Sequence, residues 1–145
     1  MKLSQVITNV ITHLREDAFL DGLEIIANIE ADHNQRLETA IRDTGLAIVV
    51  VQSSGTPSKS DSPRLLLENE MVISVLENPV KNETGKGCLE VTEHVLQALH
   101  QATWTTERGL RNVLRVDTPA YEAGPLDSGL IIYFCNFRIM SIQPR

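Results

Sequence analysis

The sequence predicts an α+β fold in which about three helices pack on a mostly antiparallel, or mixed, β-sheet. Apolar residues recur between Leu3 and Leu14 at the spacing of one helix face. Residues 46–51 read Leu-Ala-Ile-Val-Val-Val, a β-branched run that is typical of a strand buried on both faces. Two further apolar segments, 64–77 and 129–142, are also strand-like and unusually long.

The composition indicates one globular domain spanning residues 1–145. A chain of 145 residues can bury roughly 70% of its extended surface, which is enough for a core of its own. Aromatic residues make up only 4%, so that core must be aliphatic. The net charge of -6 argues against a dedicated nucleic-acid-binding surface, because such surfaces cluster basic residues.

Cysteine usage and the N-terminus indicate a cytoplasmic protein, or one assembled in a cytoplasm. Cys88 and Cys135 sit in apolar patterns without metal-ligand spacing, so we expect both to be small core residues. Residues 1–20 alternate polar and apolar side chains at helical spacing, unlike a secretory signal. No apolar run approaches the roughly 20 residues that span a bilayer, so no membrane contact is predicted.

The first half of the chain predicts two helices and two strands. The first helix should end near Asp17, and a short strand, or one helical turn, should follow at residues 23–29. The second helix is expected at residues 33–43, with Asp32 as its N-cap and Thr44-Gly45 closing it. The strand at 46–51 comes next.

Residues 52–63 have the serine, proline and glycine content of a mobile loop. The simplest arrangement is a hairpin tip between two strands. A domain linker is the alternative, and we reject it because the preceding residues are too few to form a domain of their own.

The strand at 64–77 would extend roughly 45 Å, farther than the diameter of a compact domain of this length. It must therefore bend, bulge or protrude, and Asn69 interrupts its apolar alternation. Asn78-Pro79 ends it, because proline cannot donate to a ladder. A helix at 88–101, a strand at 112–117, a loop at 118–128 and a strand at 129–142 complete the order α-β-α-β-β-α-β-β.

The candidate chemical motifs are weak. Gly85-Lys86-Gly87 precedes a helix but lacks the earlier glycine and the final Ser or Thr of a Walker loop. His94 and His100 have the wrong spacing for one helix face, and no metal-binding or nucleophile motif occurs. The sequence predicts no enzyme activity, no metal and no cofactor.

One stretch resembles a known family. A strand running into Asn78-Pro79, a polar turn with Gly85-Lys86, and a helix ending in Leu99-His100 with Trp104 soon after resemble the tail-completion and tail-terminator proteins of tailed bacteriophages. The tryptophan lies a few residues later than in that family. The amphipathic first helix, the hairpin at 52–63 and the long last strand fit the same likeness.

The resemblance implies a virion protein that assembles as a homohexameric ring. Such a ring would cap the tail tube, stop its polymerisation and join the head connector, so it would lie at the head-proximal end of the tail after assembly in the host cytoplasm. Tail tube protein, sheath protein and connector protein are the implied partners. DNA would pass through the lumen without specific binding. The family supplies no catalytic residues.

Loop character and exposure suggest which residues form interfaces in such a ring. We expect them in the loop at 52–63, the turn at 78–87 and the loop at 119–128. The candidates are Ser54, Lys59, Asp61, Asn78, Lys81, Lys86, Tyr121, Glu122 and Asp127.

Two other functions stay open on the sequence alone. One is another small phage component, from the neck, the head-completion apparatus or the baseplate. The other belongs to a different class: a dimeric α+β regulatory domain that binds a small molecule.

Overall fold

A computed structural model describes residues 3–58, 65–105, 111–125 and 129–142 of the chain. The elements, in chain order, are α1 (Leu3–Arg15), the 3-10 turn η1 (Ala18–Leu20), β1 (Glu24–Ala27), α2 (His33–Asp43), β2 (Leu46–Pro57), β3 (Leu66–Glu77), α3 (Cys88–Leu99), β4 (Thr103–Thr105), β5 (Arg111–Val113), β6 (Arg115–Ala123) and β7 (Ile131–Ile142). They confirm the predicted α+β class.

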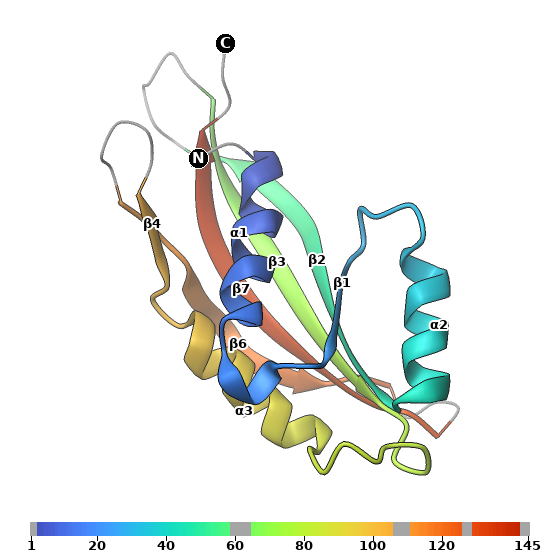
Figure 1. The fold of residues 1–145 in the computed structure, drawn as a ribbon. Coiled ribbons are helices and arrows are strands. Elements are labelled where there is room, and N and C mark those ends of the chain that lie inside the picture. The colour runs from blue at the N-terminus through green and yellow to red at the C-terminus, as the bar shows by residue number, and fades with distance from the viewer. Residues whose placement is uncertain (1–2, 59–64, 106–110, 126–128, 143–145) are drawn as a thin grey trace.

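The main sheet has the order β1-β2-β3-β7-β6, and β4 and β5 form a separate small sheet (Figure 1). β1 runs parallel to β2, while the other pairs in both sheets are antiparallel, so the main sheet is mixed. β3 pairs along its whole length with β7, from Leu66 opposite Ile142 to Glu77 opposite Ile131. The long strand is therefore central in the sheet, and the irregularity lies in β2, where the register shifts between Gln52 and Ser54.

The core lies mainly between one face of this sheet and the helices α1 and α3. Fully buried aliphatic side chains from α1 and α3 meet Ile48, Ile73 and Val75 of the sheet. Alternate strand residues point to the opposite face. There α2 packs against β1 and β2, and Ile26 and Val49 are buried.

Asn69 does not break the alternation of β3. It lies on the core face and is buried, and its Nδ2 donates to the Ser141 hydroxyl at 2.8 Å and to the Ile139 carbonyl at 3.1 Å. The polar side chain is tolerated there because both strands supply it with acceptors.

Two predicted loops are shorter than expected. Residues 52–57 belong to β2 and pair with β3 as far as Pro57 opposite Leu67, so the tip of this hairpin begins at Ser58. The loop predicted from residue 118 is strand as far as Ala123, across a cis Thr118–Pro119 peptide. The predicted strand at 112–117 is divided between β5 and β6 at Leu114, and β4 was not predicted at all.

Candidate assembly surfaces

The turn between β3 and α3 is tied to its surroundings by hydrogen bonds. The Asn82 amide donates to Glu77 Oε2 and, at 2.7 Å, to the Lys86 carbonyl, while its Oδ1 accepts from the Thr84 backbone at 2.9 Å. The second oxygen of Glu77 accepts from the backbone N–H of Cys88, at the start of α3. A buried carboxylate thus joins the end of the strand, the turn and the start of the helix.

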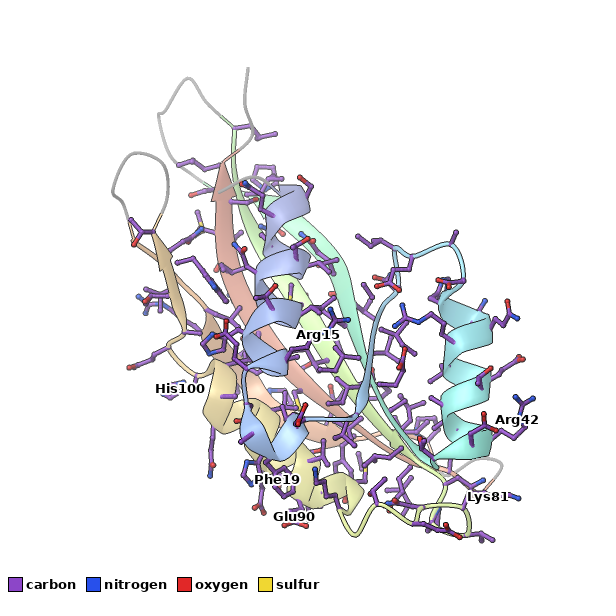
Figure 2. The ribbon with its side chains drawn as sticks, in the orientation of Figure 1. Arg15, Phe19, Arg42, Lys81, Glu90 and His100 are labelled. Atoms are coloured by element: carbon purple, nitrogen blue, oxygen red, sulfur yellow. The ribbon has the colours of Figure 1, made fainter. Side chains whose placement is uncertain are left out.

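The same turn rests on the start of β2. Gly45 has a φ of 77° and leaves no room for a side chain, since a Cβ there would lie 2.5 Å from the Asn82 nitrogen. Asn78 donates its backbone N–H to the Gly45 carbonyl at 2.8 Å. At the tip of the turn Val80 is 88% exposed, and Lys81 beside it points outward (Figure 2).

Lys86 makes contacts within the chain. Its Nζ donates to the Phe19 carbonyl at 2.6 Å and lies 5.0 Å from the centre of the Phe19 ring, which stacks on His94. Figure 2 shows Phe19 where η1 meets α3. Lys86, just before α3, therefore links the start of this helix to η1 through Phe19. The role of Lys86 in an interface stays a prediction.

The face of the sheet away from α1 and α3 carries a charged network. Arg138 on β7 donates to Asp117 at 2.8 Å and lies 3.3 Å from Glu68 and 3.8 Å from Glu70. Hydrogen bonding from Arg138 lowers the pKa of Asp117, and the same bond raises the pKa of Arg138. Arg138 thus faces three carboxylates, so this part of the face keeps a net negative charge even with Arg115, which lies opposite Arg138 on β6.

Tyr121 and Glu122 lie on β6, at one edge of the sheet. Tyr121 is 49% exposed, with its ring centre 6.1 Å from that of Tyr133. Glu122 accepts a hydrogen bond from the Asn136 amide at 3.3 Å. Both side chains are accessible, as expected for interface residues, but they lie on a strand.

Ser54 lies on the exposed part of β2, and its hydroxyl donates to Glu70 at 3.2 Å. Lys59, Asp61 and Asp127 fall outside the described residues. Of the predicted candidates, the fold brings Asn78, Lys81 and Lys86 together in one turn and Tyr121 and Glu122 on one strand. Ser54 lies apart from both groups.

The remaining chemical features are the potential metal ligands and the two cysteines. They contain no group of three or more potential metal ligands, and no helix among them is long and apolar enough to cross a membrane. Burial, with a contribution from the charge of Glu77, raises the pKa of Cys88 to about 12, and burial likewise raises that of Cys135 to about 12. Thiols of this kind are poor nucleophiles.

Sequence reasoning missed two features that bear on assembly. The charged network was hidden because Glu68, Asp117 and Arg138 are far apart in the sequence and only strand pairing brings them together. The small β4–β5 sheet was missed because three-residue strands carry almost no periodic signal. The β-prone residues Thr103, Trp104 and Thr105 were the available indication.

Comparisons with known proteins give a structural likeness. No protein-family model matches the sequence, and no curated protein does either. Among solved structures, a chain of the virion of a native gene transfer agent particle matches with a TM-score of 0.63 and 18% sequence identity, over 92% of this chain and 92% of that one. At this identity the likeness is one of fold, and it extends over nearly the whole of both chains.

Proposed function

We propose that this protein is a structural component of a virion, and more specifically the protein that caps the tail tube as a ring. The observation that carries the proposal is the shared fold with a chain of a gene transfer agent virion over 92% of both chains. The sequence resemblance to phage tail terminators supplies the finer role. Neither catalysis nor a bound cofactor is needed for it.

The surface features are compatible with such a role. The turn at 78–87 is held by hydrogen bonds on both sides, so its exposed Val80 and Lys81 would lose little conformational freedom on docking. The negative sheet face around Arg138 would repel DNA phosphates, as a surface that DNA passes without binding requires.

In this proposal the ring stops tube growth sterically. One ring face is complementary to the last tube ring, and the opposite face meets the head connector instead of another tube ring. A ring of identical chains closes through heterologous contacts, in which each copy uses two different surfaces.

The test combines native mass spectrometry with tail assembly in vitro. We expect rings of a single stoichiometry, and we expect tube protein polymerised with the purified protein to give tubes bound at one end and stopped in growth. A strictly monomeric protein that leaves tube length unchanged would contradict the proposal. Rings that bind a baseplate or a head preparation but not tubes would assign it to another part of the particle.

A further inference from the structure

We infer that neighbouring copies in the ring join by strand pairing, with β4 of one copy lying against the open edge of β2 in the next. This inference rests on the proposed ring and names the contact that closes it. It starts from the two edges of the main sheet, which are built differently.

The edge formed by β6 has the features by which proteins protect an exposed strand. Arg115, Asp117 and Glu122 place charges along it. The register with β7 shifts between Val116 and Tyr121, and Pro119 lacks an N–H. Charges, irregular pairing and proline all discourage a foreign strand.

The opposite edge is unprotected over part of its length. β1 covers β2 only to Val50, whose carbonyl accepts from the Asn28 N–H, so within the described residues the edge from Gln52 to Pro57 has no neighbouring strand. Residues 53–57 are exposed, and no charged residue occurs between Leu46 and Pro57. Apart from Pro57 at its end, which has no N–H, this stretch lacks the features by which natural edges are protected.

The backbone of this edge has hydrogen-bonding groups to offer. Ser58 donates to the Leu66 carbonyl, so Ser58 and Thr56 face β3, and the alternate residues Gly55 and Pro57 face outward. Gly55 offers both its N–H and its C=O there, whereas Pro57 offers only its C=O. By the same alternation from Val50, Gln52 also points its backbone groups outward.

Two buried amide atoms lie where the edge opens. Among the described side chains, Asn28 Oδ1 and Gln52 Nε2 are buried without a hydrogen-bond partner. Asn28 directly follows β1, and Gln52 lies two residues beyond Val50, the last residue of β2 that pairs with β1. Buried polar groups are normally paired, so an additional segment at this point would complete the local bonding.

The matching strand is β4. β5 lies against β7, where the Asn112 amide donates to the Met140 carbonyl, and β4 is the outer strand of the small sheet (Figure 1). Leu114 donates to the Ala102 carbonyl, so by alternation Thr103 and Thr105 turn their backbone groups away from β5. Both residues are exposed, and the strand Thr-Trp-Thr carries no charge.

The two edges lie on different sides of the fold, because β3 and β7 separate β2 from the β4–β5 sheet. When β4 of one copy pairs with β2 of the next, two different surfaces meet. The first copy still has its β2 edge free and the second its β4 edge, so further copies can add at both ends. Repetition of such a contact closes into a ring when the rotation per copy allows it.

The test is a disulfide between the two strands. Chains carrying both Thr56→Cys and Thr105→Cys should, on mild oxidation of the assembled ring, form a ladder of covalent oligomers on a non-reducing gel. Chains carrying either substitution alone should stay single, and an equal mixture of the two single variants should give dimers. The wild-type chain, with its buried Cys88 and Cys135, controls for other thiol reactions.

A charge placed on the open edge gives an independent measure. We expect Thr56→Lys to raise the protein concentration needed for half-assembly at least about tenfold, because a charged side chain on an edge strand discourages pairing with a further strand. Ala123→Lys on the exposed β6 edge is the matched control and should leave assembly unchanged.

The outcomes separate this inference from the proposed function. Rings that form normally but give no β2–β4 disulfide, or that tolerate Thr56→Lys, would overturn the strand pairing and leave the tail-capping role intact. Dimers of Thr56→Cys alone would mean that two β2 edges pair symmetrically, which also overturns it. Absence of any ring would remove the proposed function together with the contact.

Discussion

The two halves of the β2–β3 hairpin share the same strands but lie in different environments. In the half nearest α3, residues such as Ile48, Val50, Ile73 and Val75 are fully buried beneath α1 and α3. In the other half, residues 53–57 are exposed, and the strands carry Ser, Gly and Glu side chains. The first half stabilises the monomer, whereas the second contributes little apolar burial.

This division explains why the strands are longer than the core requires. A strand pair that extends past the helices adds backbone hydrogen bonds but little hydrophobic free energy. In the proposed ring, this is the stretch that pairs with the neighbouring copy. The buried hydrogen bond between Asn69 and Ser141 links β3 to β7 beside the buried side chains of Met71 and Ile139.

The largest effect on stability is expected at Ile73, in the buried half. Ile73→Ala should lower the free energy of unfolding by about 2–5 kcal/mol, because it leaves a cavity beneath the helices. Urea denaturation measures the loss as a lower midpoint.

The adjacent residue provides the control for that substitution. Val72 points to the opposite face and is only partly buried, so Val72→Ala should cost clearly less. Equal losses at both positions would mean that the two faces of the strand are equally packed, contrary to the full burial of Ile73 and the partial exposure of Val72.

A smaller loss is expected in the turn between β3 and α3, which lies at the buried end of the hairpin. Asn82→Ala removes the bonds to Glu77 and to the Lys86 carbonyl and leaves the buried carboxylate with one fewer donor. We expect a loss of about 1–3 kcal/mol in the free energy of unfolding. Lys81→Ala, at the exposed neighbouring residue, should change the unfolding midpoint very little, and an equal effect there would contradict the cross-linking role of Asn82.

The sequence was sufficient to predict the helices and strands that have a strong periodic pattern. It was insufficient where a segment with the composition of a loop becomes a strand by pairing with a neighbouring strand. The helix at 33–43 and the strand beginning at Leu46 follow directly from their residues. Gln52 to Pro57 read as a loop from composition, yet the long strand opposite provides it with a ladder. In the same way, residues 121–123 read as loop from composition, yet they pair with β7 soon after Pro119.

The contacts of the candidate residues were harder to predict than the fold, for a physical reason. Loop character located the turn at 78–87, but it could not reveal that Lys86 is engaged with Phe19, which lies far away in the sequence. An open strand edge has no signature in composition, because it depends on where β1 stops. Such features arise from topology, which a single sequence specifies only indirectly.

The smallest effect is expected in the exposed half, at the network around Arg138. Arg138 holds the pKa of Asp117 in the folded protein below its usual value. The ionised Asp117 therefore stabilises the fold at any pH above its pKa in the unfolded chain. This stabilisation is lost as the pH falls through the pKa of Asp117 in the folded protein. Arg138→Gln should therefore raise the Asp117 pKa towards its ordinary value, as measured by carboxyl NMR titration. The difference in unfolding midpoint between the wild-type protein and Arg138→Gln should be slight at pH 7, since exposed ion pairs contribute little, and should vanish in acid.

Arg42→Gln, which removes the exposed pair with Asp43 on α2, is the control and should leave the Asp117 titration unchanged. An unaltered Asp117 pKa in Arg138→Gln would mean that the arginine does not act on this carboxylate in solution.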